Sequence, residues 1–212
     1  MAGAPHIRVF ARPLQRTHAM TKADTLARPA PARARILETA LRLFYAHGTR
    51  AVGIDRIIAE SGVAKMSFYR HFPSKADLVA AFLEERHARW MAWFRARLEA
   101  RRAKRGGGLA AVADVLREWF SARDFHGCAF INILAETERA CVREREIAKR
   151  HKAELMALLV ALARCDGAAR PAEAGRLALI VVEGAIVRAE MTGEGARVAA
   201  DTKLLLAGIA AA

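Results

Sequence analysis

The sequence predicts an all-α protein, and three observations support this fold class. Alanine, leucine and arginine dominate the 212 residues, whereas runs of β-branched residues are few. Apolar residues recur at helical spacing in one segment after another, which is enough for about nine helices. The length also suffices for one or two domains with their own hydrophobic cores.

The first predicted helix spans residues 32–47. Gly48 follows its last apolar residues and is a suitable C-cap, because glycine adopts a left-handed conformation at no steric cost. The apolar face of this helix consists of Ile36, Leu37, Ala40, Leu41, Leu43 and Phe44.

Residues 54–75, IDRIIAESGVAKMSFYRHFPSK, predict two short helices joined by a tight turn. Ile54, Ile57 and Ile58 lie at the spacing of one helical face. Gly62 stands where the chain must turn sharply, a position that favours glycine. The second helix is short because a proline follows it.

The second of these helices has an apolar and a polar side. Val63, Phe68 and Phe72 supply the apolar side. Two helices at a steep angle, the second with a cationic outer face, fit the major groove of DNA. The donors on that outer face are Lys65, Ser67, Tyr69, Arg70 and His71.

The chain carries the segments A-R-I-L-x-x-A-L-x-L-F, H-G-T, I-I-A-E-S-G-V-A-K, F-Y-R-H-F-P-S-K and A-D-L at fixed spacing. Together they resemble the DNA-binding domain of the TetR family of bacterial transcriptional regulators, over residues 33–82. Two positions depart from the family pattern. Gly53 stands where Ser or Thr usually caps the second helix, although glycine is an acceptable cap. Ile58 stands where alanine is usual, which suggests wider packing of that helix.

The resemblance implies three regions. Residues 1–31 would be a disordered basic arm, residues 32–76 a helix-turn-helix DNA-binding domain, and residues 77–212 a helical effector-binding and dimerisation domain. Beyond residue 82 the resemblance is limited to length, helicity and a weak G-C-x-F-x-N pattern at 127–132.

At the DNA site we assign two kinds of contact. Lys and Arg can donate to guanine O6 and N7, and a Met methyl can pack on a thymine methyl. The resemblance places phosphate-gripping residues beside these readers. The predicted base readers are Lys65, Met66, Ser67 and Arg70, and the predicted phosphate contacts are Tyr69, His71 and Lys75. The alternatives are that Tyr69 only packs and that Arg70 is a solvated surface charge.

Charge supports a polyanion-binding module independently of the resemblance. The formal net charge of +13 lies entirely in residues 1–105, and residues 106–212 are neutral overall. A basic patch confined to one half is typical of nucleic-acid binding. The alternative is a generally basic proteome. Residues 1–31 lack the apolar stretch of a secretory signal, and they either form a disordered arm or touch DNA beside the main site.

Further helices are predicted in the rest of the chain. Pro73 ends the recognition helix, and the S-x-x-D pattern from Ser74 to Asp77 begins the next one. The segment 177–187 is apolar nearly all round, so both of its sides must be covered. The predicted spans are 75–102, 108–122, 128–140, 143–165, 171–191 and 195–210.

The resemblance implies that the last two helices pack against their copies in a homodimer. Two recognition helices would then reach successive major grooves about 34 Å apart. The alternative is that these helices fill the core of a monomer.

The resemblance also implies an unidentified small-molecule effector among the C-terminal helices. Aromatic side chains there would suit an apolar or aromatic ligand. The alternative is that aromatic residues at helical spacing belong to the core. The candidate pocket residues are Trp90, Phe94, Trp119, Phe120, Phe130, Asn132 and Glu136.

Other chemistries receive little support. His126, His151, Glu136 and Glu138 do not have the spacing of a known metal site, so no metal or other cofactor is expected. Three cysteines without C-x-x-C spacing suggest a reducing cytoplasm, and Cys128 is interpreted as a small buried residue rather than a redox sensor. No catalytic motif or membrane-spanning run stands out, so neither an enzyme nor a membrane protein is expected.

The leading hypothesis is a homodimeric repressor that a ligand releases from a palindromic operator in double-stranded DNA. The first alternative is an architectural DNA-binding protein without an effector response. The second is a helical enzyme or binding module that has inherited a DNA-reading domain.

Overall fold

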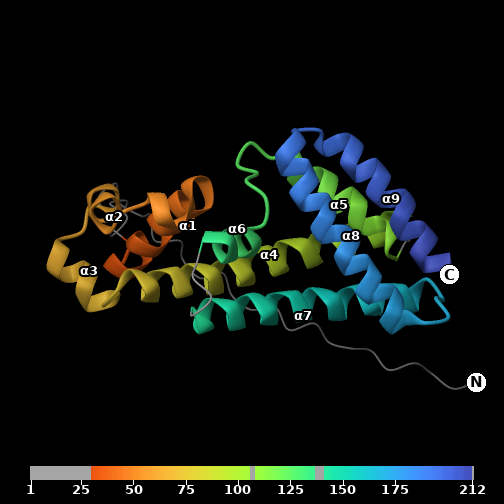
Figure 1. The fold of residues 1–212 in the computed structure, drawn as a ribbon, viewed down its shortest axis with the longest axis horizontal. Helices are drawn as coiled ribbons and strands as arrows, with labels where there is room; N and C mark the ends of the chain where they lie inside the picture. The colour runs from red at the N-terminus through yellow and green to blue at the C-terminus, as the bar shows by residue number, and fades with distance from the viewer. Residues whose placement is uncertain (1–29, 106–107, 137–140, 212) are drawn as a thin grey trace, which may run out of the picture. The chain divides into compact units, whose positions relative to one another are not determined.

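The computed structural model describes residues 30–105, 108–136 and 141–211. This part of the chain forms nine α-helices and no strands, which confirms the all-α prediction (Figure 1). Nearly all of the predicted arm, residues 1–29, lies outside the described residues. The helices are α1 (Ala32–Ala51), α2 (Ile54–Ser61), α3 (Lys65–His71), α4 (Lys75–Arg105), α5 (Ala110–Phe120), α6 (Ala129–Glu136), α7 (Val142–Cys165), α8 (Pro171–Thr192) and α9 (Gly195–Ala211).

Helices α1, α2 and α3 pack around one small core. Helix α1 is regular up to Gly48, where φ 78° and ψ 165° interrupt it, as the predicted C-cap implies. Helices α2 and α3 both contact α1. The core side chains Ile36, Leu43, Ile57 and Phe68 are fully buried at this junction.

The turn between α2 and α3 is held by its own backbone and by α1. Gly62 is left-handed, with φ 62° and ψ 34°, and its N–H donates to the carbonyls of Ile58 and Ala59. Arg35 of α1 donates from Nε to the Ser61 carbonyl at 3.1 Å and from Nη2 to the Gly62 carbonyl. The guanidinium satisfies carbonyls that the C-terminal end of α2 leaves unpaired, and it interacts favourably with the negative end of that helix's dipole. Arg35 therefore fixes the angle at which α3 leaves α2.

Helix α4 begins with the predicted cap. The Asp77 N–H donates to Ser74 Oγ at 3.1 Å, and Ser74 Oγ donates to the Asp77 carboxylate at 2.7 Å. This 31-residue helix packs against α1 near its start and against α5 and α7 further along (Figure 1). The predicted division at residues 76 and 77 thus falls inside a continuous helix.

The remaining helices form the larger core. Helix α7 packs against α8, α5 packs against α9, and α8 and α9 pack against each other. Helix α8 buries Ala178, Val182 and Ala185 on one side. On its other side Ile180 is 63% exposed and Met191 is 81% exposed. Within the single chain only one side of this helix is covered, so the prediction that both sides are covered requires a partner.

One predicted helix is shorter than expected, and a second is described only in part. The span predicted as 108–122 is α5 (Ala110–Phe120), and the span predicted as 128–140 is α6 (Ala129–Glu136). The last four residues of the latter prediction, 137–140, lie outside the described residues. No helix in the described part of the chain is long and apolar enough to cross a bilayer.

Candidate nucleic-acid interface and the helices behind it

Helix α3 presents three of the four predicted base readers to solvent. Lys65 and Arg70 are exposed, and Met66 is 81% exposed. Ser67 is half-buried, and its Oγ accepts a long hydrogen bond of 3.5 Å from Arg70 Nη2. An exposed methionine is unusual for a helix in a globular fold, so its apolar side chain suits contact with a partner.

The opposite side of α3 is anchored by aromatic packing. Phe68 is fully buried and Phe72 is 3% exposed, as predicted for core residues. The Tyr69 ring meets the Phe68 ring edge-on at 5.3 Å between centroids, while 38% of Tyr69 stays exposed. Tyr69 thus packs on the core and stays partly accessible. His71 and Lys75, the other predicted phosphate contacts, are half-buried beside it.

The ion pair on the outer face of α3 is weak, so this face can still bind a partner. Lys65 Nζ lies 4.0 Å from Asp55 Oδ1, and both side chains are well exposed. Such a surface pair contributes less than about 1 kcal/mol, so a phosphate or a base edge can displace it. The arrangement is a cationic, mostly exposed helix fixed to a rigid base.

Comparison with known proteins identifies this arrangement. Residues 36–82 match the sequence pattern described as bacterial regulatory proteins, tetR family. A TetR-family transcriptional regulator from Streptomyces coelicolor is 31% identical, over 84% of this chain and 94% of that one, with a TM-score of 0.73. The chain belongs to the TetR family of transcriptional regulators.

Other solved structures agree with this family. A putative TetR regulator from Streptomyces avermitilis is 30% identical, covers 85% of this chain and 98% of its own, and gives a TM-score of 0.70. Reduced NemR from E. coli is 19% identical over 84% of this chain and 97% of its own, with a TM-score of 0.72, and supports the fold alone. Comparison with curated proteins gives no match.

In this TetR-family regulator, polar contacts link α1 to the segment before α6. The Tyr45 hydroxyl donates to the Gly127 carbonyl at 3.0 Å and accepts from the His126 N–H at 3.1 Å. The Arg86 guanidinium of α4 lies 3.8 Å from the centre of the Tyr45 ring. Burial raises the pKa of Tyr45, and Arg86 partly opposes that shift. Tyr45 therefore stays a neutral hydroxyl that can donate and accept.

The C-terminal end of α6 holds the end of α1. Glu136 Oε2 accepts hydrogen bonds from the Thr49 N–H and the Thr49 hydroxyl, both at 2.7 Å, and from the Arg50 N–H at 3.1 Å. A Cβ on Gly48 would lie 2.0 Å from Glu136 Oε1, and Gly48 also has positive φ. The predicted ligand contact Glu136 thus has its carboxylate oriented toward α1.

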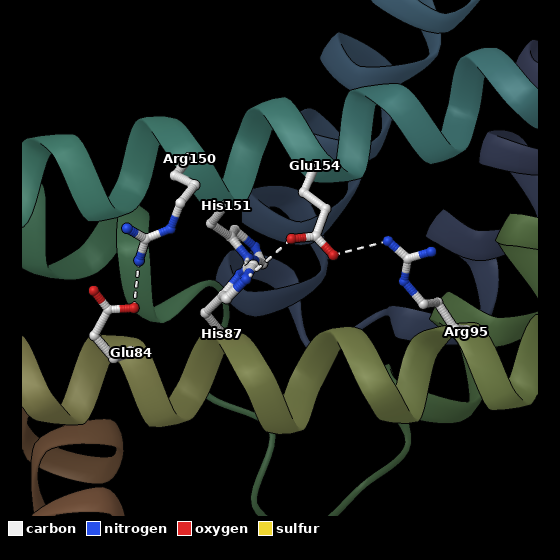
Figure 2. A network of polar contacts seen from close by, with 6 residues as sticks. All are labelled: Glu84, His87, Arg95, Arg150, His151 and Glu154. Carbon is white, nitrogen blue, oxygen red and sulfur yellow. Dashed lines mark hydrogen bonds and ion pairs between the residues drawn. The ribbon is translucent and has the colours of Figure 1, made fainter.

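Helices α4 and α7 are joined by a row of polar contacts (Figure 2). His87 Nδ1 and His151 Nδ1 are 3.0 Å apart, and His87 Nε2 lies 3.1 Å from Glu154 Oε2. Glu154 also pairs with Arg95 at 2.8 Å. One turn away, Arg150 pairs with Glu84. The row connects α7 to the helix that continues from the DNA-reading region.

His151 is the buried member of this row. It is 3% exposed, and its ring stacks on Phe130 of α6 at 3.9 Å and 14°. Burial, with Lys152, His87 and Arg86 nearby, lowers the pKa of His151 to about 3. The ring is therefore neutral at physiological pH, and it links α6 to α4 without a charge.

The predicted ligand residues divide into several environments. Trp90, Trp119 and Phe130 line a small cavity beside His151, with only about 10 Å³, the room of one water molecule. Phe94 and Phe120 are core residues. The Asn132 amide donates to the His126 carbonyl at 3.0 Å. Three of the seven predicted ligand residues therefore line a cavity. That the set binds an effector stays a prediction.

The structure also contains a larger groove that the sequence did not predict. It lies between α6, α7 and α8, has a volume of about 430 Å³, and includes Phe130 among its lining residues. Arg145, Lys149, Lys152 and Met156 line it from α7. Their spacing of 0, 4, 7 and 11 residues places them on one helical face, a signal that was present in the sequence.

We expect the buried His151 to make folding sensitive to mild acid. The folded pKa is about 3 and the ordinary value is 6.5, so below pH 6.5 the unfolded chain binds a proton that the folded chain does not. The contribution of neutral His151 to stability is therefore fully present above pH 6.5, and it is lost as the pH falls toward 3. Between pH 7.5 and 5.5 this group alone lowers the free energy of unfolding by about 1.4 kcal/mol.

Urea unfolding of the wild type and His151→Leu at both pH values measures this difference. The wild type should lose about 1.4 kcal/mol more than the variant. The exposed His47 provides the control, because His47→Gln should keep the wild-type dependence. Equal acid sensitivity in wild type and His151→Leu would contradict the assignment.

Proposed function

We propose that this TetR-family regulator is a homodimeric repressor that binds a palindromic operator and leaves it when a small molecule binds. The observation that carries the proposal is the location of exposed large hydrophobic residues. Among the described residues, eight of ten lie either on α3 or on one face of α8 and α9. The first group faces outward beside cationic side chains, and the second is available to a second copy.

The geometry of α3 supports the proposed DNA contacts. We assign base readout to Lys65, Met66, Ser67 and Arg70, which occupy its outer side. We assign phosphate contacts to Tyr69, His71 and Lys75, near its C-terminal end and the start of α4. These roles separate the contacts that read sequence from those that set register and supply salt-sensitive affinity.

The dimer would form through α8 and α9. Leu177, Ile180, Gly184, Val187 and Met191 recur along α8 at spacings of three and four residues, which makes one continuous stripe. Leu204 and Leu205 of α9 are 75% and 56% exposed. An apolar surface of this kind is a typical protein–protein interface, and a twofold axis lets it pair with itself.

Release would pass through α6. Its residue Phe130 stacks on His151, its residue Glu136 holds the α1 end, and the segment before it holds Tyr45. A ligand that moves α6 therefore changes contacts to the DNA-reading helices. By linkage, the ligand must bind the DNA-incompetent state more tightly, and DNA must weaken ligand binding equally.

This proposal keeps the domain organisation expected from the sequence. Residues 32–76 would read DNA, residues 77–212 would bind the effector and the second subunit, and the protein would act in the cytoplasm. A footprint on selected DNA tests it. Protection of one short palindrome supports a repressor, whereas continuous coverage supports the architectural alternative.

Arg70 and Lys75 should have separable roles on a site selected by the wild-type protein from random duplexes. Arg70→Ala should cost about 1–3 kcal/mol on that site and little on a scrambled one, because a base contact is lost. Lys75→Ala should weaken binding to both sequences alike and reduce the salt slope by about 1. Fluorescence anisotropy at several salt concentrations gives both quantities, and reversed behaviour of the two variants would exclude the assigned roles.

Charges in the α8–α9 stripe should dissociate the dimer. Ile180→Glu with Leu204→Glu would bury two carboxylates per subunit against apolar groups, which costs several kcal/mol. Analytical ultracentrifugation should find monomers, and operator affinity should fall with them. Val142→Glu is the matched control, since Val142 is 66% exposed on α7, away from the stripe. A variant that remains dimeric would rule out this interface.

Glu136 should protect the amides at the end of α1. Glu136→Ala leaves the Thr49 and Arg50 N–H groups without their acceptor, so their hydrogen exchange should accelerate. The free energy of unfolding should fall by about 1–3 kcal/mol. Glu146→Ala, which removes only a surface pair with Lys149, is the control and should change stability by less than about 0.5 kcal/mol. Unchanged exchange at Thr49 would show that the contact does not form in solution.

A further inference from the structure

The groove between α6, α7 and α8 combines an apolar surface with a cationic edge. Its volume of about 430 Å³ is within the range of sites for drug-sized ligands. The apolar residues that line it are Phe130, Ile131, Leu134, Ala148, Ala153, Met156 and Leu179. Such a surface favours a ligand with a substantial hydrocarbon or aromatic body.

The cationic edge belongs to α7. Arg145, Lys149 and Lys152 line the groove, and none of the described residues that line it is acidic. Lys149 pairs with Glu146 at 2.7 Å, and Lys152 pairs with Glu183 at 3.1 Å, so two carboxylates lie just outside. The Lys152 side chain is only 19% exposed, and its ammonium has three donors. One donor goes to Glu183 and a second lies 3.6 Å from Cys128 Sγ, so the third can bind an anion in the groove.

Lys152 lies where the groove meets the small aromatic cavity beside His151. It lines both spaces, as does Phe130. An anion at Lys152 would be more desolvated than one at the exposed Lys149, and charge pairs are stronger where water is excluded. The position of Lys152 thus makes it the main contact for a charged head group.

We infer that the effector is an amphipathic small molecule with one anionic group, such as a fatty or aromatic carboxylate. Its apolar body lies on Ile131, Leu134 and Met156, and its anionic head pairs with Lys152. A neutral molecule would leave the cationic edge unused, and a polyanion without an apolar body would leave the apolar surface exposed to water. This inference rests on the proposed ligand-released repressor and specifies the ligand class of that site.

A second copy of the chain is the less suitable occupant. The dimer stripe includes Leu177, whereas the groove includes Leu179, which lies about 200° further around α8. Leu179 is half-buried and Leu177 is 41% exposed. Leu177 and Leu179 therefore lie on different sides of α8. Among the described residues, the groove and the stripe border each other only at Ile131 of α6, which lines the groove and also the hollow beside Ile180 and Val187.

Occupancy of this groove would be transmitted by α6. Phe130, Ile131 and Leu134 of that helix line the groove. Glu136, at its C-terminal end, binds the end of α1, and Phe130 contacts His151, which reaches His87 on α4. An anionic effector thus acts on the same eight-residue helix that holds the DNA-reading region.

Isothermal titration of the full-length protein tests the ligand class. The probes are decanoate, 2-naphthoate and the neutral decanol, which separate fatty from aromatic carboxylates and charge from hydrophobicity. At least one carboxylate should bind tenfold or more tightly than decanol. Lys152→Met should reduce that preference at least fivefold, Lys152→Arg should keep it, and Ala153→Phe should block binding of the preferred probe. Lys203→Met is the matched control, because Lys203 pairs with Asp114 on α9 and α5, away from the groove.

Equal binding of decanoate, 2-naphthoate and decanol would overturn the inference, as would a carboxylate preference that Lys152→Met leaves intact. If Lys152→Met does not fold, Lys149→Met and Ala153→Phe decide, and unchanged carboxylate affinity in both counts against the groove. Monomers formed by Ala153→Phe, seen by ultracentrifugation, would assign the groove to a second copy instead.

Operator release is measured separately, with the wild-type protein on its selected site. Carboxylate binding in the groove without release from DNA would support the site and refute the proposed release mechanism. If the protein binds a palindrome but no carboxylate, the proposed DNA-binding function stands and the proposed ligand class is refuted.

Discussion

The DNA-reading surface depends on the burial of one side chain, Phe68. Helix α3 has seven residues, and a helix of that length is not stable by itself in water. Phe68 is fully buried, which stabilises the helix by about 1.5–3 kcal/mol and fixes which face is turned outward. Lys65, Met66 and Arg70 are exposed because Phe68 is not. The angle of α3 then depends on the turn at Gly62 and on Arg35, which holds that turn from α1.

Much of the fold could be predicted because it is encoded locally. The apolar period around Ile57, the left-handed Gly62 and the Ser74 cap each act within about one helical turn, and each appears in the structure. The same holds for the break at Gly48. The sequence could not predict the contacts of α6, because Glu136 and Phe130 meet partners that lie far along the chain.

The parts of the site that were missed depend on such distant contacts. Glu136 accepts from Thr49, 87 positions away, and nothing near Glu136 indicates that partner. His151 was considered as a metal ligand, and its contact with His87 requires α4 and α7 to lie side by side (Figure 2). The groove needs three helices at once. Only its cationic edge, at 145, 149 and 152, has a local pattern, and the neutral total charge of residues 106–212 conceals it.

Helix α6 is suited to transmit binding because it has little stability of its own. With eight residues, its position is set by the groove on one side, the α1 end at Glu136 and the ring of His151. Charged hydrogen bonds contribute about 1.5–3 kcal/mol each. Converting a population from 1:99 to 99:1 takes about 5.5 kcal/mol of differential ligand affinity. Loss of the Glu136 contacts together with displacement of Phe130 is of that magnitude, so a small ligand acting on α6 alone can shift the DNA-binding equilibrium without unfolding either core.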